Sequence, residues 1–254
     1  MLITENYPTH TYRCRHAGGT DRDYVEAAIA AGLTTLGFSD HSPMVFTTDH
    51  KSSFRMSLEE TPGYFESLLQ LREEYKDRIR ILIGVEAEYY PACWQGYLAF
   101  MRNFPLDYKI LGQHFVFDEE HGGPGAFQET DDPERLRDYY RCVLEAVSTG
   151  EFLYVAHPDV LHYVGDPVAY DDLTRDFLRR LEPTGIPLEI NRLGLHDGRN
   201  YPNPRFWDLV AETSLPAVVG LDAHAPHVFR DDKSVADCLA IAESRGIRVV
   251  SGLL

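Results

Sequence analysis

The chain has 254 residues and a formal net charge of −16, from 24 basic and 40 acidic residues. No cluster of Lys and Arg interrupts this acidity, so we expect no nucleic-acid partner. No run approaches the roughly 18 apolar residues that a membrane-spanning helix needs, so we expect no membrane partner. The start lacks a signal-peptide pattern and the four cysteines include no C-x-x-C pair, which favours a cytoplasmic protein with reduced thiols.

Short apolar runs alternate with longer amphipathic stretches along the whole chain, which is the pattern of βα units on a parallel sheet. The expected strands are residues 2–7, 33–38, 79–85, 108–111, 152–155, 186–190, 217–221 and 247–250. No internal repeat or long flexible linker divides this alternation. The sequence therefore predicts a single barrel-like α/β domain over residues 1–254.

The stretches between these strands carry helix signals. Thr20 and Asp23 form a variant capping box, and Gly32 is placed to close that helix. Capping side chains followed by a first-turn proline occur at Thr61-Pro62, Asp132-Pro133 and Asn203-Pro204. Apolar residues from 136 to 147 follow helical spacing and stop near Gly150. The two longest connections, 41–61 and 115–131, are either lids over a site or plain surface insertions.

Metal-capable side chains follow nearly every expected strand. They are His10 and His16, Asp40 and His41, Glu86, His114, His157 and Asp159, Glu189, and Asp222 and His224. Parallel strands place their carboxyl ends at one edge, so these groups are expected to meet there. Imidazoles and carboxylates at close range need cations, and this donor set suits Zn, Mn or Fe. Two or three divalent ions and a hydrolytic reaction are therefore expected.

The ordered motifs resemble those of the PHP family, specifically its histidinol-phosphatase branch. The resemblance rests on residues 9–17, 37–43, 84–91, 111–115, 156–159, 188–191 and 222–226. It implies a distorted (β/α)7 TIM-like barrel with a three-metal centre at the carboxyl ends of the strands. It also implies hydrolysis of a phosphomonoester.

The resemblance also assigns ligands. It implies that one ion is held by His10, Glu86 and Asp222, a second by Glu86, His114 and His157, and a third by His16, His41 and His224. Asp222, His224 and His157 are the residues that it places closest to the reaction. Asp40 and Asp159 are expected to orient ligating imidazoles, although Asp40 could equally be a surface acid.

The first motif departs from the family pattern H-x-H, because Pro8 stands where its first histidine would be. A proline ring cannot coordinate metal and also removes a backbone donor. Either water or a neighbouring carboxylate fills the gap, or one ion binds more weakly.

A phosphate substrate would also need cationic side chains, and a planar Arg is the natural choice. The candidates for substrate binding are Arg55, Arg199 and His196, followed by Arg192. Each Arg could instead pair with a surface acid, and His196 could be a solvated loop histidine.

The function expected from the resemblance is histidinol-phosphate phosphatase, which releases L-histidinol and phosphate in histidine synthesis through attack by metal-bound hydroxide. One alternative is a PHP phosphoesterase acting on another small phosphomonoester or a nucleotide. A second is a non-catalytic metal-binding relative, which the departure at Pro8 makes conceivable. The oligomeric state is left open by the sequence.

Overall fold

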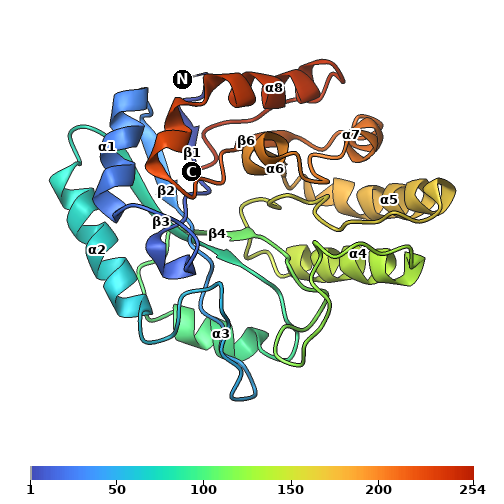
Figure 1. Cartoon of the computed structure of the whole chain (residues 1–254), viewed down its shortest axis with the longest axis horizontal. Helices are drawn as coiled ribbons and strands as arrows, with labels where there is room; N and C mark the ends of the chain where they lie inside the picture. The colour runs from blue at the N-terminus through green and yellow to red at the C-terminus, as the bar shows by residue number, and fades with distance from the viewer. Residues whose placement is uncertain (1) are drawn as a thin grey trace. The chain divides into compact units, whose positions relative to one another are not determined.

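The computed structural model describes residues 2–254, which form two compact units (Figure 1). The first unit contains the described residues up to 87, residues 91–110 and residues 220–236. The second contains residues 88–90, 111–219 and 237–254. Both units combine helices with strands, so the chain has an α/β fold, as the alternating sequence pattern predicts. The prediction of a single domain stays a prediction.

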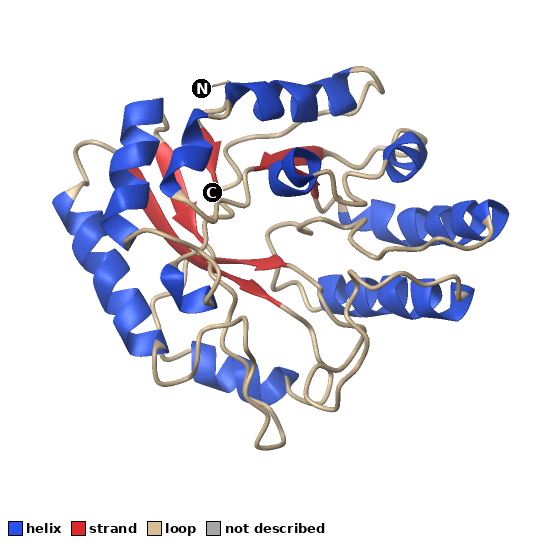
Figure 2. Cartoon of the chain, viewed as in Figure 1, coloured by secondary structure: helices blue, strands red, loops and turns tan. Residues whose placement is uncertain are grey.

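The sheet of the first unit has four strands in the order β1, β2, β3, β4 (Figure 2). These are β1 Glu5–Asn6, β2 Thr35–Phe38, β3 Arg80–Ala87 and β4 Tyr108–Leu111. Strand β2 runs parallel to both β1 and β3, with Asn6 opposite Leu36 and Phe38 opposite Ile83. Seven consecutive residues of β3 are buried, as expected of a parallel strand that is covered on both faces.

The helices of the first unit are η1 Tyr12–Cys14, α1 Asp21–Ala31, α2 Thr61–Glu74, α3 Trp94–Met101 and η3 Pro226–Arg230. Both hydrogen bonds of the capping box between Thr20 and Asp23 are present, and Gly32 closes α1 in the left-handed conformation. The cap expected at Thr61 is wrong. Glu60 is the N-cap of α2, and the Thr61 hydroxyl instead donates to the carbonyl of Ser57.

In the second unit, strands β5 Leu188–Asn191 and β6 Ala217–Gly220 pair with each other. Its helices are α4 Pro133–Ser148, α5 Pro167–Leu181, η2 Glu182–Thr184, α6 Arg192–Asp197 and α7 Pro204–Val210, and α8 Asp232–Glu243 follows near the chain end. The predicted caps at Asp132 and Asn203 are confirmed. Helix α4 buries the expected apolar stripe, and its core includes Tyr140 stacked on Phe177 of α5.

Three of the expected strands are reduced to two residues or to isolated bridges. Only Glu5–Asn6 of the run 2–7 is a strand, because Leu2 is exposed and Pro8 has no amide to donate to a ladder. The run 152–155 pairs through Val155 alone, which forms parallel bridges with Leu111 and Leu188, and the run 247–250 pairs through one bridge from Val249 to Ala217. Val249 is exposed, so this last run has no fully buried face to hold a longer ladder.

Among the described residues, no helix combines the length and the apolar character needed to cross a bilayer.

Candidate metal centre

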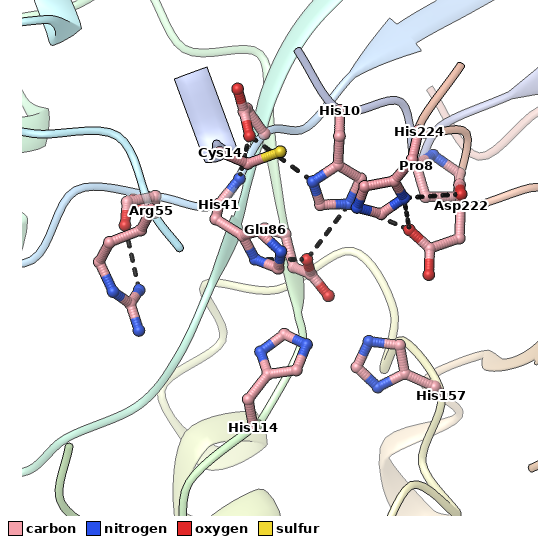
Figure 3. A network of polar contacts seen from close by, with 12 residues as sticks. Pro8, His10, Cys14, His41, Arg55, Glu86, His114, His157, Asp222 and His224 are labelled. Carbon is pink, nitrogen blue, oxygen red and sulfur yellow. Dashed lines mark hydrogen bonds and ion pairs between the residues drawn. The ribbon is translucent and has the colours of Figure 1, made fainter. Parts of the chain in front are cut away.

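The backbone register of the first unit brings four strand ends side by side. Thr9 forms a parallel bridge with Ala223, and His41 forms one with Glu86. Between them, the amide of Ser39 donates to the carbonyl of Thr9 at 2.9 Å. Equal positions past the strand ends therefore share one edge of the sheet. The side chains gathered there include those of His10, His41, Glu86, Asp222 and His224 (Figure 3). A nitrogen of His16 lies within 4.8 Å of nitrogens of His41 and His224.

Imidazole nitrogens and carboxylate oxygens face one another within this cluster. Nε2 of His10 lies 3.1 Å from Oδ1 of Asp222 and 3.5 Å from Oε2 of Glu86. Nδ1 of His41 lies 3.0 Å from the same Glu86 oxygen. The side chains of these four residues are at most 10% exposed. Buried groups of this kind need a charged partner, and the shared Glu86 oxygen places two imidazoles on one carboxylate.

His16 and His224 give the clearest test of whether this cluster fits a metal. Nδ1 of His16 lies 2.7 Å from the carbonyl oxygen of Cys14, and Nδ1 of His224 lies 3.0 Å from that of Asp222. A carbonyl only accepts, so each Nδ1 carries a proton and each neutral ring has its lone pair on Nε2. The two Nε2 atoms are 3.1 Å apart. With both rings neutral, two lone pairs are aimed at each other, an arrangement that either a shared proton or a divalent cation resolves.

The residues of this cluster ionise differently, and contact with the Cys14 side chain raises the pKa of His16. Burial and the neighbouring His10 lower the pKa of His224 to about 4, so its ring is neutral at pH 7 and can donate a lone pair. Burial opposes ionisation of Asp222, but His224 and His10 outweigh it and hold the pKa of this carboxyl well below its usual range. Burial also opposes the charged form of His10, yet the nearby carboxylates of Asp222 and Asp40 raise its pKa well above the ordinary value.

Asp40 has an oxygen 3.6 Å from Nδ1 of His10 and is fully buried, so its interpretation as a surface acid is wrong. It accepts hydrogen bonds from the amide and the hydroxyl of Thr11 and from the amide of His41. These bonds tie together the segments that carry His10 and His41.

Asp222 has a positive φ of 49°, a strained conformation for a residue with a side chain, and such strain is concentrated at functional sites.

Sequence analysis missed one member of the cluster, Cys14. Its sulfur and nitrogens of His10 and His224 all lie within 4.8 Å of one another. The residue stands four positions after His10 and two before His16, a spacing that matches no thiolate metal motif.

The second unit holds the other two predicted ligands. The rings of His114 and His157 lie with their centroids 5.0 Å apart, and both residues are buried. Nδ1 of His114 is 2.7 Å from Oε1 of Glu88, a carboxylate that sequence analysis also missed. The amide of His157 donates to Glu189 at 3.0 Å, and its φ of +30° is a second strained position. The only sequence signal for Glu88 is its place two residues after Glu86.

Asp159 follows His157 and is buried, which raises its pKa to about 6. It accepts hydrogen bonds from the amide of Asn203 at 2.6 Å and from Nε1 of Trp207 at 3.1 Å. These contacts show Asp159 holding the start of α7. Its predicted role in orienting an imidazole stays a prediction.

The cationic candidates lie in different settings. Arg55 is buried, donates to the carbonyl of Ser42 at 3.1 Å and lines a cavity of about 680 Å³ in the first unit with Arg15 and Lys51. Arg199 is partly exposed and donates to Tyr201 and Asp197, each at 2.9 Å. His196 is exposed in the last turn of α6, whereas Arg192 is buried at its start.

A parallel α/β sheet with imidazoles and carboxylates at its strand ends is the architecture of a protein built to hold divalent metal ions. The model of the PHP domain family matches residues 6–193, and the chain belongs to this family.

The chain is 32% identical over 226 residues to a probable histidinol-phosphatase of Deinococcus radiodurans, and the match covers 85% of each chain. It is 24% identical over 239 residues to a probable histidinol-phosphatase of Schizosaccharomyces pombe, covering 84% of this chain and 78% of the other. The structure of histidinol phosphate phosphatase from Lactococcus lactis, complexed with zinc, L-histidinol and phosphate, matches with a TM-score of 0.74. The two sequences are 24% identical, and the match covers 98% of this chain and 97% of the L. lactis chain. The structure of a protein from Listeria monocytogenes described as a putative histidinol phosphatase matches with a TM-score of 0.73 at 18% identity, covering 91% of this chain and 99% of the other. These two structures share the fold of this chain.

Proposed function

We propose that this protein is a metal-dependent phosphomonoesterase and that its substrate is L-histidinol phosphate, which it converts to L-histidinol and phosphate. The observation that carries the proposal is the strand-end cluster of the first unit, where imidazoles and carboxylates meet at 3.0 to 3.5 Å. The substrate is supported by relatives that are named histidinol-phosphatases. The use of metal is supported by the L. lactis structure with zinc.

The donor set fits divalent ions, and we propose Zn, Mn or Fe, with two or three ions bound. His16, His41 and His224 would hold one ion, because their nitrogens lie within 4.8 Å of one another. A second would be held by His10, Glu86 and Asp222, whose contacts are all between ligand-type atoms. The assignment of His114 and His157 to a further ion with Glu86 stays a prediction of the family resemblance.

When bound, divalent ions polarise a phosphoryl group and lower the pKa of water, which makes hydrolysis possible near neutral pH. The residues of this chain hold those ions and move the proton. Asp222 and His224 are proposed as catalytic residues because one is ionised and the other neutral at pH 7. His157 is the third: one of these residues would accept the proton that the attacking water loses and would pass it, directly or through water, to the leaving alkoxide.

Cationic side chains would then orient the phosphate ester. Arg55 is proposed for this role because it lines a cavity in the unit that carries the strand-end cluster. Arg199 and His196 are proposed for the second unit, at the end of α6 and directly after it. We also propose the distorted (β/α)7 barrel of the family as the complete fold, supported by the parallel pairing of β1, β2 and β3 and by the parallel bridges of Val155 and Val249.

The test is a phosphate-release assay with added Zn, Mn or Fe on histidinol phosphate, nucleotide monophosphates and sugar phosphates. We expect the highest kcat/KM on histidinol phosphate and a loss of activity on chelation. His224→Ala should lower kcat/KM by more than about 100-fold, because it removes a direct metal ligand. His227→Ala is the matched control, since His227 is exposed on η3 only three residues away, and it should retain full activity.

The outcomes separate the alternatives. Faster turnover of another phosphomonoester would keep the metal-dependent phosphatase and reject the substrate. Bound metal without turnover of any phosphoester would favour the non-catalytic relative. A Pro8→His variant with unchanged metal content and rate would show that the departure at this position has no effect.

A further inference from the structure

The first metal motif of this chain lacks one imidazole, because Pro8 occupies its position. The backbone around Pro8 keeps the register of the strand ends: its carbonyl accepts a hydrogen bond from the amide of Ala223 at 2.9 Å. Figure 3 shows Pro8 close to His224 and Asp222, where its ring carries no donor atom. A metal centre at this edge therefore takes its missing donor from solvent or from elsewhere in the chain.

Cys14 is the side chain placed to supply that donor. It is fully buried at the end of η1, and its sulfur lies within 4.8 Å of nitrogens of both His10 and His224. Figure 3 shows the sulfur turned toward the His10 ring. All three residues belong to the first unit.

The turn that carries Cys14 is rigidly held. The Thr11 side chain caps η1 by accepting from the amide of Arg13, and Arg15 ends it in the left-handed conformation with a φ of 74°. The guanidinium of Arg13 is itself anchored to Asp21 in a buried ion pair. The thiol is therefore fixed beside the imidazoles.

A second observation points to a ligand at this place. Nδ1 of His10 is buried and makes no hydrogen bond within the described residues, and the oxygen of Asp40 that approaches it is 3.6 Å away. Buried polar atoms in folded proteins nearly always have partners. The unsatisfied atom belongs to the same group of three side chains as the thiol.

We propose that Cys14 is a metal ligand and that its thiolate takes the place of the imidazole missing at Pro8. The inference rests on the proposed metal-dependent function. On binding, the Sγ–H bond breaks, its proton passes to solvent and a bond forms between Sγ and the metal. Thiolate is a soft ligand, so the centre should prefer Zn or Co over Mn and Mg more strongly than an imidazole and carboxylate set would.

The test is the absorption spectrum of the whole protein after its metal is replaced by Co²⁺. A cysteine ligand gives a thiolate-to-cobalt charge-transfer band in the near ultraviolet, which imidazole and carboxylate ligands do not give. We expect this band in the unmodified protein and in Cys238→Ala, whose buried thiol lies in α8. We expect Cys14→Ser to lose the band and to hold less cobalt per chain by elemental analysis.

Combining Pro8→His with Cys14→Ser should restore the cobalt content without restoring the band. A cobalt-loaded protein with no charge-transfer band overturns the role of Cys14 and leaves the phosphatase proposal intact. A protein that binds no cobalt, zinc or manganese overturns both. If Cys14→Ser fails to fold by circular dichroism, the spectra of the unmodified protein and of Cys14→Ala decide the question.

Discussion

Replacing Arg13 with Met should be among the most destabilising single changes in the first unit. Nη1 of Arg13 lies 3.0 and 3.1 Å from the two oxygens of Asp21, and both side chains are only 5–6% exposed. The hydroxyl of Ser67 donates to Asp21 at 2.6 Å, and Thr11 accepts from Arg13 at 3.2 Å. The pair therefore has partners for both of its charges, and its environment is nearly dry.

The magnitude follows from the burial. With an effective dielectric constant of about 20, two charges about 3 Å apart attract by about 5 kcal/mol before the cost of desolvation. Arg13→Met removes that attraction and leaves Asp21 charged and buried, so we expect the free energy of unfolding to fall by about 3–5 kcal/mol. The double variant Arg13→Met, Asp21→Asn keeps the bond from Ser67 and leaves no buried charge. It should lose only about 1–2 kcal/mol.

The assay is a double-mutant cycle by urea unfolding, followed by circular dichroism at pH 7, with Asp21→Asn as the second single variant. The expected result is a coupling energy of at least about 2 kcal/mol that changes little between low and high salt, since buried pairs are poorly screened. Two single losses that simply add, or an Arg13→Met loss below about 1 kcal/mol, would refute the reasoning.

Three further changes test other parts of the molecule. Tyr108→Phe removes the hydroxyl that donates to the buried carbonyls of Tyr7 at 2.7 Å and Phe38 at 3.0 Å; unfolding in urea should show a loss of about 1–3 kcal/mol, and a loss below about 0.5 kcal/mol would contradict this role. Glu88→Gln weakens the acceptor for Nδ1 of His114, so chelator titration should show about 10- to 100-fold weaker metal binding, and unchanged affinity would remove Glu88 from the site. The Arg15 hydrogen bond lowers the pKa of Glu60 to about 2, so this pair stabilises the fold above pH 4.5 and loses that contribution as the pH falls toward 2. Both side chains are about a third or more exposed, so Glu60→Gln should cost less than about 1 kcal/mol at pH 7 and still less at pH 3, and an equal cost at both values would exclude the linkage.

The strand-end cluster could be predicted because parallel strands impose it. His41 and Glu86 each follow a buried run, and a residue's position past the end of a parallel strand decides which neighbour it meets. The bridge between His41 and Glu86 is this rule in the structure. This argument needs no knowledge of turns or side-chain rotamers. It therefore brings the strand-end residues together even though the bounds of β1 were not predicted.

Features that depend on a turn were not predictable in this way. Cys14 reaches the cluster through η1 and the left-handed Arg15, and no periodicity in the sequence encodes that path. Thr61 looked like a cap, but the preceding Glu60 occupies that position. Its carboxylate is engaged by Arg15 and by the amide of Ser57, so local competition for hydrogen bonds decided where α2 begins.

The histidines beside Cys14 are oriented by backbone carbonyls, and this makes the test of Cys14 a clean one. His16 and His224 are each fixed by a backbone carbonyl two residues earlier, which belongs to Cys14 and Asp222 respectively. His114 is fixed by a carboxylate side chain instead. A Cys14→Ser substitution leaves its carbonyl in place, so His16 keeps its tautomer and its aim while the sulfur alone is lost. Any change in the metal that this substitution causes therefore reports on the thiol and not on a displaced histidine.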